Sequence, residues 1–202
     1  NVHTMNKKNQ RSIELQLKLF SSIEKNDKIS QRYISKDLNV ALGLANALIK
    51  KFVKKGFLKL SEAPVKRYFY YITPKGLVEK TNLTRQYLKN SLDFYKKAKD
   101  NYESIFIQIK HLRFKKVILA GSGELAEIAI LASNIQNVRI NFIYDNNAKE
   151  DMFCGIPVKK VIPKKLQNKD TIFVLTEAKK INEVYLKIDK KYKILKPSFL
   201  NI

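Results

Sequence analysis

The fold of the N-terminal part is decided by the stretch Ile29-Ser30-Gln31-Arg32-Tyr33-Ile34-Ser35-Lys36-Asp37-Leu38 and by the two segments that follow it. Residues 41–56 have the apolar spacing of a helix, and residues 57–73 contain two strand-like runs around a basic tip. The order of elements is therefore helix, turn, helix and hairpin. This order predicts a winged helix-turn-helix domain of α+β class, and a strongly basic domain of this shape is typical of DNA readers.

The apolar residues of this part fall on the inner face that such a domain needs. Ser30 is a suitable N-cap for a helix over 31–38, and Asn39-Val40 predicts a tight turn after it. A preceding helix over 11–24 also carries apolar residues at helical spacing. We expect the following residues of the three helices to face inward: Ile13, Leu17, Phe20, Ile23, Tyr33, Ile34, Leu38, Leu42, Ala45, Ile49 and Phe52.

The opposite face of the segment 41–56 has the composition of a recognition helix, although an ordinary solvated face is the alternative. It carries an amide that can pair with adenine, lysines that reach phosphate or guanine, and small or apolar groups that fit a thymine methyl group. These residues are Gly43, Leu44, Asn46, Ala47, Lys50 and Lys51. The DNA contacts that we predict for the whole domain are Ser30, Gln31, Arg32, Gly43, Asn46, Lys50, Lys51, Lys66 and Arg67.

A hairpin follows this helix. Gly56 ends the helix, and strands are expected over 57–60 and 68–72. The connection between them predicts a short wing, with Lys66 and Arg67 near its base, where basic side chains contact phosphate or the minor groove. The aromatic residues 68–71 fit stacking on single-stranded bases or packing within the hairpin, and their alternation favours packing.

A long helix without Pro or Gly is expected over 77–113. Every third or fourth position falls on one line, which is heptad spacing over about five repeats. The positions on this line are Leu77, Thr81, Thr84, Leu88, Ser91, Tyr95, Ala98, Tyr102, Ile105, Ile109 and Leu112. A helix of about 36 residues extends about 54 Å, too far for one small domain to bury. We therefore expect a homodimer through a coiled coil, and packing against the second domain of the same chain is the alternative.

Several short motifs within residues 11–112 are shared with a known family. They are Ile29-Ser30-Gln31-Arg32, Leu42-Gly43, Asn46, Lys54-Lys55-Gly56-Phe57, Tyr71-Ile72-Thr73-Pro74-Lys75-Gly76, Leu83-Thr84 and Phe94-Tyr95. On these motifs the segment resembles the MarR-type winged-helix regulators, in particular the group associated with exopolysaccharide gene clusters. The resemblance implies a transcription regulator that acts as a dimer on double-stranded DNA. The short regulators of this family lack the domain that follows here.

The C-terminal part has the pattern of a βαβ unit. A strand over 115–120 leads into a glycine-containing loop and a helix through residue 133, and a second strand over 138–144 ends on Asp145. Gly121, Gly123 and Ala126 fit the fingerprint in which backbone amides hold a phosphate and a later acid binds a ribose hydroxyl. The cofactor-binding site that we predict consists of Gly121, Ser122, Gly123 and Asp145. A degenerate domain that serves only for packing is the alternative.

The remaining elements complete a second domain. Strands are expected over 156–158, 171–175 and 192–195, and helices over 162–168 and 177–187, which predicts an α/β Rossmann-like, three-layer domain with a mostly parallel sheet. The stretches 117–126, 142–147 and 154–158 resemble the N-terminal nucleotide-sugar-binding domain of bacterial sugar O-acyltransferases. That resemblance implies a ligand at the Gly121 loop and Asp145. The hexapeptide repeat that carries acyl transfer in that family is absent, and Glu124 places a negative charge where a pyrophosphate would rest.

Length and charge agree with this organisation. The 202 residues predict a winged-helix domain over 10–76, a dimerisation helix over 77–113 and a Rossmann-like domain over 114–202. The formal net charge of +22 favours a polyanionic partner, with compositional bias towards lysine as the alternative. The single Cys154, the absence of a signal peptide and the absence of a membrane-length apolar stretch indicate a cytoplasmic protein without a membrane partner.

Three functions are compatible with these patterns. The first is a DNA-binding transcriptional regulator whose C-terminal domain senses a nucleotide, a nucleotide-sugar or NAD(P). The second is an enzyme that uses such a ligand, and the third is an adaptor without catalysis. His3 and His111 lie in no convincing catalytic constellation, Cys154 has no apparent base partner, and no metal-ligand cluster is present in the sequence. We therefore expect a regulator and no enzyme.

Overall fold

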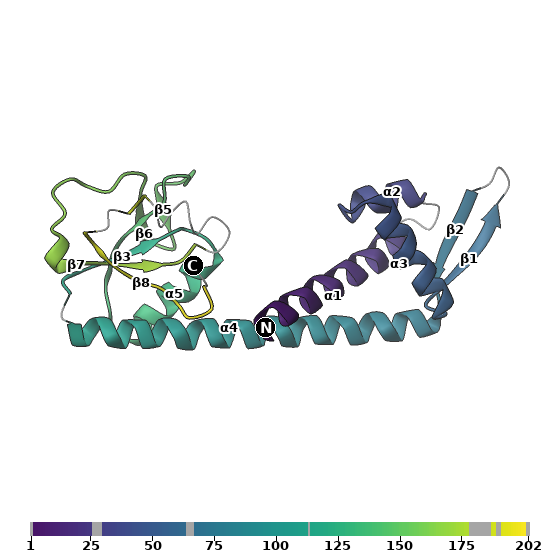
Figure 1. Ribbon diagram of the computed structural model, residues 1–202, viewed down its shortest axis with the longest axis horizontal. Helices are drawn as coiled ribbons and strands as arrows, with labels where there is room; N and C mark the ends of the chain where they lie inside the picture. Colours follow the sequence, from purple (N-terminus) through teal and green to yellow (C-terminus); the bar gives the residue numbers. More distant parts are fainter. Residues whose placement is uncertain are drawn as a thin grey trace. The chain divides into compact units, whose positions relative to one another are not determined.

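The structure, a computed structural model, describes residues 2–25, 30–63, 67–112, 114–177, 187–188 and 191–200 (Figure 1). The side chains of residues 2–8, 62, 63, 67 and 68 lie outside this description. The chain divides into two compact units, Asn1–Leu92 and Asp93–Ile202, and one long helix contributes to both. Each unit has its own hydrophobic core.

The N-terminal unit contains the predicted elements in the predicted order. They are α1 (Val2–Lys25), α2 (Gln31–Asp37), α3 (Leu42–Lys54), β1 (Leu58–Ala63), β2 (Arg67–Ile72) and the first part of α4 (Pro74–Leu112). The two strands pair antiparallel, with Leu58 opposite Ile72 and Ala63 opposite Arg67. The winged helix-turn-helix is therefore confirmed, and α1 extends well before the start predicted for it.

Three aromatic rings join the elements of this unit. Phe52 of α3 packs against Phe20 of α1 with 5.0 Å between ring centroids, and against Phe57 with 5.6 Å in an edge-to-face arrangement. All three side chains are buried. The rest of the core is supplied by Ile13, Leu19, Ile23, Ile34, Leu38, Ala45, Ile49, Leu58, Tyr70 and Leu83. Most of the predicted inward-facing residues are thus confirmed.

Two predicted core residues are exposed instead. Tyr33 is 54% exposed, because the short helix α2 buries the side that carries Ile34 and successive residues point about 100° apart. Leu42 is 39% exposed, since it is the first residue of α3 and lies before the first buried position of that helix. Leu17 is half-buried and packs against the core, beside the fully buried Leu19 and Phe20.

The start of α4 is tied to the end of α3 by Thr73. Its hydroxyl donates to the Gly56 carbonyl oxygen at 2.6 Å and accepts the Gly76 N–H at 3.0 Å, while its own N–H donates to the Phe57 carbonyl oxygen at 3.1 Å. Thr73 is therefore the N-cap of α4, and Pro74 occupies the first helical position. A Cβ atom at Gly76 would lie 2.1 Å from the Phe57 carbonyl oxygen, so only glycine fits there.

The two parts of α4 pack on two different cores. In the N-terminal unit, Leu83 and the half-buried Tyr87 pack on the winged-helix core, whereas Leu88 is 55% exposed. In the C-terminal unit, four positions of the predicted heptad line are buried in the core of that unit, namely Ala98, Tyr102, Ile105 and Ile109. A continuous seam along the whole helix is thus wrong, because its second half packs within the same chain.

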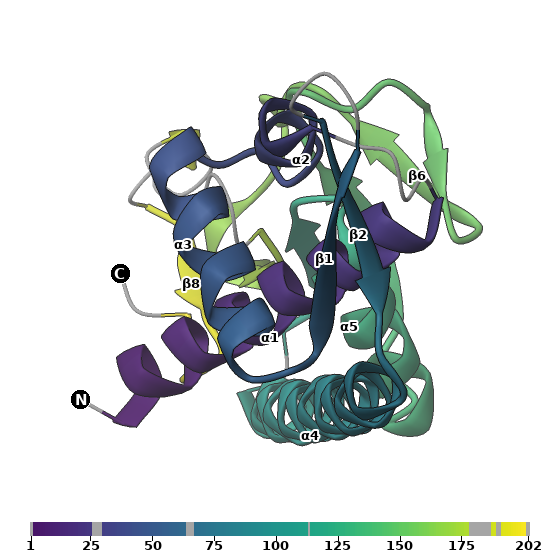
Figure 2. The same cartoon turned by 90° about the vertical axis from the view of Figure 1, so that its right-hand side faces the viewer.

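The C-terminal unit is built on a six-stranded sheet of order β5-β6-β4-β3-β7-β8. Its elements are β3 (Lys116–Ala120), α5 (Glu124–Ile135), β4 (Ile140–Tyr144), β5 (Met152–Phe153), β6 (Ile156–Lys159), the 3-10 helix η1 (Asn168–Asp170), β7 (Thr171–Leu175) and β8 (Lys193–Leu195). All strand pairs are parallel except β5–β6, so the mostly parallel sheet is confirmed. Helix α5 runs beside the second part of α4 (Figures 1 and 2), where Lys110 Nζ donates to the Gln136 carbonyl oxygen at 3.1 Å.

Two details of this unit differ from the sequence prediction. The helix expected over 162–168 is absent, because the Leu166 carbonyl accepts a hydrogen bond from the Tyr192 hydroxyl at 3.0 Å and this segment forms turns before η1. Strand β5 was not expected, and the left-handed residues Cys154 and Gly155 turn it back onto β6. The helix expected over 177–187 falls mostly on residues outside the described part, so the three-layer, Rossmann-like arrangement stays a prediction.

The junction at Gly76 gives a direct test of the N-terminal unit. We expect Gly76→Ala to lower the free energy of unfolding of this unit by about 1–3 kcal/mol, since the added methyl group collides with a backbone oxygen. Thermal and urea unfolding of the full chain measure this change. Gly43→Ala is the matched control, because a Cβ atom at Gly43 meets nothing within 4 Å. Equal stability of the two variants would contradict the assignment.

Candidate nucleic-acid interface

The turn between α2 and α3 is fixed by local hydrogen bonds. Ser30 caps α2, as predicted, and Asn39 follows the helix in the left-handed conformation with a φ of 52°. The Val40 N–H donates to the Ser35 carbonyl and the Asn39 N–H to the Lys36 carbonyl, each at 3.0 Å, which are the two bonds of a Schellman motif. The sharp turn into α3 therefore follows from backbone geometry that the sequence sets locally.

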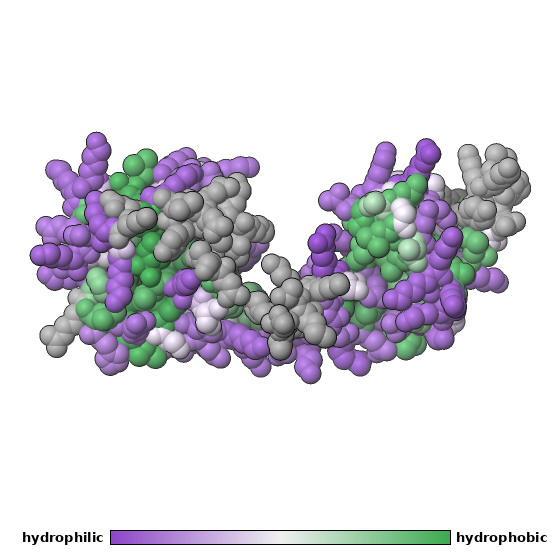
Figure 3. All heavy atoms as spheres, in the orientation of Figure 1, coloured by the Kyte–Doolittle hydropathy of each residue, from purple (hydrophilic) through white to green (hydrophobic). Residues whose placement is uncertain are grey.

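Helix α3 is buried on one side and open on the other. Ala45, Ile49 and Phe52 hold it in the core, and the opposite side is solvent-exposed. We call this side the outer face of α3; it consists of Gly43, Leu44, Ala47, Lys50, Lys51 and Lys54. On the view in Figure 3, hydrophobic side chains gather over the α2–α3 region and are bordered by hydrophilic ones. The outer face thus combines an apolar first half with a basic second half.

Two of the predicted DNA contacts are turned towards the protein. Asn46 is half-buried at the flank of α3, and its Oδ1 atom is buried without a hydrogen-bond partner among the described residues. Gln31 is also half-buried, and its Nε2 donates to the Tyr70 hydroxyl at 3.1 Å, which joins α2 to β2. Ser30 and Arg32 are exposed, and the Ser30 hydroxyl accepts the Tyr33 N–H as the cap of α2.

The surroundings of the outer face are basic. Helix α3 contains no acidic residue, and further exposed cations lie on neighbouring elements at Arg32, Lys36, Lys55, Lys59 and Lys75. Lys55 and Lys75 both lie over the ring of Phe57, with Nζ 5.5 and 5.8 Å from its centroid. Lys54 was not among the predicted contacts, although its spacing of four from Lys50 was visible in the sequence. A surface of this charge attracts the phosphates of a duplex.

The wing residues are described only in part. Lys66 lies outside the described residues, and for Arg67 only the backbone is described, as the first residue of β2 opposite Ala63. The prediction that Lys66 and Arg67 contact DNA therefore stays a prediction. The aromatic run behind them includes Tyr70, which is buried, and Tyr71, which is 43% exposed. This alternation agrees with packing within the hairpin.

The four residues of the predicted ligand site lie together at the carboxyl ends of β3 and β4. The Ser122 hydroxyl and the Ser122 N–H both donate to Asp145 Oδ2, at 2.6 and 3.1 Å, and Asp145 Oδ1 accepts the Asn147 N–H at 2.9 Å. The loop of Gly121 to Gly123 and the acid that ends β4 are thus in direct contact. However, the carboxylate already occupies the Ser122 amide that a phosphate would use.

The two glycines of this loop have different roles. Gly121 has a φ of 111°, and a Cβ atom there would lie 2.8 Å from the Cβ atom of Glu177, so the fold itself requires glycine. Its carbonyl oxygen accepts the Thr176 hydroxyl at 2.7 Å. Gly123, the N-cap of α5, faces open space. Gly123 is therefore the position in this loop where a ligand can approach the backbone.

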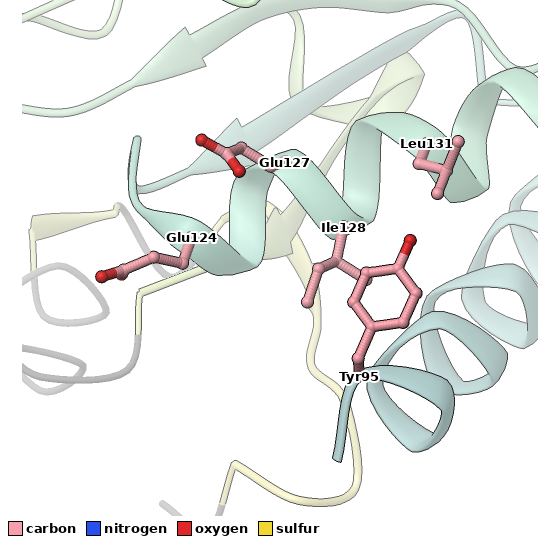
Figure 4. A pocket seen from close by; sticks show the side chains of 5 residues that line it. All are labelled: Tyr95, Glu124, Glu127, Ile128 and Leu131. Atoms are coloured by element: carbon pink, nitrogen blue, oxygen red, sulfur yellow. The ribbon is translucent and has the colours of Figure 1, made fainter. Parts of the chain in front are cut away.

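A shallow hollow of about 380 Å³ lies between the second part of α4 and α5 (Figure 4). It is lined by Tyr95, Glu124, Glu127, Ile128 and Leu131. In Figure 4 the ring of Tyr95 lies beside Ile128. Glu124 and Glu127 extend from α5 away from this contact. The hollow is open and apolar and carries two carboxylates, so it differs from the enclosed pockets that bind small molecules.

The described residues contain no group of three or more His, Cys, Asp or Glu side chains placed to hold a metal ion. Cys154 is exposed and unpaired. Among the helices in the described part of the chain, none is long and apolar enough to cross a membrane.

Residues 14–59 match a protein family described as winged helix-turn-helix DNA-binding. The matched segment runs from α1 through α2 and α3 into β1, so it contains the outer face of α3. A comparison with curated proteins gave no match. These findings support a winged-helix, DNA-binding regulator. The MarR subtype and the Rossmann-like character of the second unit stay predictions.

Gly43 offers a test of the interface that separates stability from binding. Gly43→Ala should raise the stability of the N-terminal unit by about 0.5 kcal/mol, because alanine favours a helix and meets open space. The same change should weaken duplex binding about tenfold, since the methyl group keeps the α3 backbone away from the DNA. Urea unfolding and fluorescence anisotropy on one duplex give the two quantities. Unchanged affinity would show that the outer face is not in contact with DNA at Gly43.

Proposed function

We propose that this protein is a transcriptional regulator that binds double-stranded DNA through the outer face of α3. The observation that carries the proposal is this exposed, acid-free face with Lys50, Lys51 and Lys54, in a segment that matches DNA-binding winged helices. Each lysine that neutralises a phosphate releases a counterion, which makes the binding strong at low salt and salt-dependent. The net charge of +22 acts in the same direction. The proposal assigns the chain no catalytic reaction.

The proposal includes a homodimer formed through the first part of α4. Leu77, Leu88 and Leu92 are 50, 55 and 60% exposed, whereas Leu83 faces the winged-helix core. Leu77 and Leu88 belong to the heptad line, and Leu92 extends the same side of the helix by one turn. Leucines that remain exposed on one side of a helix favour association, and a two-fold dimer reads inverted repeats. The MarR subtype and control of polysaccharide genes are parts of the proposal that rest on sequence motifs alone.

The proposal gives the C-terminal unit the role of a sensor for a nucleotide or nucleotide-sugar. Its support is a set of hydrogen bonds that leads from the glycine loop to α4. Ser122 contacts Asp145, the Thr176 hydroxyl donates to the Gly121 carbonyl, and the hydroxyl of Tyr102 on α4 donates to the Leu175 carbonyl at 3.0 Å. Burial raises the pKa of Tyr102, so its hydroxyl remains a donor. A ligand that displaced Asp145 from Ser122 would alter this connection.

Selection of random duplexes tests DNA binding and the dimer together. The full chain, carrying either the native sequence, Lys50→Ala with Lys51→Ala, or Leu88→Glu, is used to enrich a random pool at two salt concentrations. We expect the native protein to recover an inverted repeat and the lysine variant to recover none. Leu88→Glu should recover single half-sites, because a charge in the contact separates the protomers.

The outcomes of the selection discriminate between functions. Weak binding that is independent of sequence and equally salt-sensitive in all three proteins would contradict the regulator and favour an adaptor. Recovery of the same inverted repeat by Leu88→Glu would leave the DNA reader in place and reject this dimer surface. Sedimentation of the native protein and Leu88→Glu without DNA provides the matching measurement of mass.

Thermal unfolding tests the sensor. UDP-glucose, NAD⁺ and ATP are added separately to the full chain, and one of them should raise the midpoint, since a ligand that binds only the folded protein stabilises it. Ser122→Ala should abolish this rise. In the absence of ligand it should lower the free energy of unfolding by no more than about 1 kcal/mol. If none of the three compounds shifts the midpoint, the C-terminal unit is better described as a packing domain.

A further inference from the structure

None of the exposed side chains in the first two turns of α3 carries a hydrogen-bonding group, and Asn46 there is half-buried. The outer face begins with Gly43, Leu44 and Ala47, all exposed, and Leu44 is 51% exposed. The lysines of the outer face come only afterwards, at Lys50 and beyond. A recognition helix that reads bases by hydrogen bonds carries Arg, Asn, Gln, Glu or Asp at such positions. This helix carries aliphatic groups instead.

The amide side chains that could replace them are both half-buried. Asn46 is the only amide in α3, and it lies half-buried at the flank with its Oδ1 atom enclosed. Gln31 of α2 is bonded to Tyr70. The lysines reach phosphates readily, because a flexible ammonium group suits a point contact. The described surface of α2 and α3 therefore offers few hydrogen-bond donors or acceptors for reading bases.

Neither Gly43 nor Leu44 is explained by packing within the chain. A Cβ atom at Gly43 would meet nothing within 4 Å, yet glycine is among the least favourable residues for a helix. Leu44 leaves half of its surface in water beside lysines. An aliphatic side chain next to an unobstructed backbone fits an apolar group at the floor of the major groove. The only such group that a DNA base presents there is the C5 methyl of thymine.

We propose that α3 reads thymine methyl groups in A·T-rich duplex DNA through Leu44 and Ala47, with Gly43 allowing the close approach. This inference rests on the proposed DNA-binding function and adds the class of base that is read. Lys50, Lys51 and Lys54 fix the helix on the phosphates and contribute no choice between bases. The contact is apolar, so it discriminates by the presence of a methyl group and not by hydrogen bonding.

Replacement of thymine by uracil tests the inference, because uracil lacks only the C5 methyl group and keeps every hydrogen-bonding atom. A duplex recovered by the native full chain is synthesised with thymine or with uracil at all its A·T pairs, and both forms are titrated by fluorescence anisotropy. The uracil duplex should bind more weakly by about fourfold for each methyl group in contact, which corresponds to about 0.8 kcal/mol. The recovered sequence itself should be rich in A·T pairs.

Variants assign the discrimination to residues. Leu44→Ala should bind the thymine duplex more weakly and lose most of the preference for thymine over uracil. Leu131→Ala, which truncates a 41% exposed leucine on α5, is the matched control and should keep the full preference. Lys51→Ala should weaken both duplexes by the same factor. Because Leu44 is exposed, its truncation is expected to leave folding intact, and circular dichroism verifies this.

Each outcome separates the inference from the function on which it rests. Equal, salt-sensitive binding of both duplexes by the native protein would overturn thymine readout and leave DNA binding standing. A preference for thymine that Leu44→Ala retains would overturn the assignment to Leu44. Failure to bind either duplex above the level of the lysine double variant would reject DNA binding itself, and the inference with it.

Discussion

The first turn of α4 approaches the carbonyl oxygen of Phe57 so closely that only glycine fits at position 76. Thr73 bonds to both sides of this contact, at Gly56 and at Gly76. The end of α3, the start of β1 and the start of α4 therefore meet within a few atoms. The position of α3 relative to the hairpin therefore depends on a backbone contact at this junction.

The two sides of α3 have different roles. Ala45, Ile49 and Phe52 anchor one side of α3 in the core. Packing therefore does not determine which residues stand on the other side. The outer face then carries residues that stability does not favour: Gly43 weakens the helix, and Leu44 keeps apolar surface in water. Residues that lower stability without any role in packing commonly mark a function. They lie on the same face as Lys50, Lys51 and Lys54.

Local chemistry was predictable here, and orientation was not. The cap at Ser30, the turn at Asn39-Val40 and the helix end at Gly56 follow from residue type and immediate neighbours, so the sequence located them correctly. Asn46 and Gln31 are half-buried, because which side of a helix is buried depends on partners distant in sequence, and their contact with DNA stays a prediction. Heptad spacing in α4 likewise cannot tell a second chain from the chain's own sheet, and only the packing around Tyr102 separates the two.

In the glycine loop, the sequence motif predicted which residues lie together but not the hydrogen bonds between them. The motif brought Ser122 and Asp145 together as expected, yet the serine hydroxyl and amide already hold the carboxylate. An anionic ligand would have to displace the Asp145 carboxylate from the Ser122 amide. A ligand with a hydroxyl group would instead donate a hydrogen bond to Asp145 in its present position. A displacement is also what would make the loop responsive, because a ligand can shift an equilibrium only if it favours one of two arrangements. In the sensor that we propose, the contact between Ser122 and Asp145 thus weakens phosphate binding and also transmits ligand binding to Gly121, Thr176 and α4.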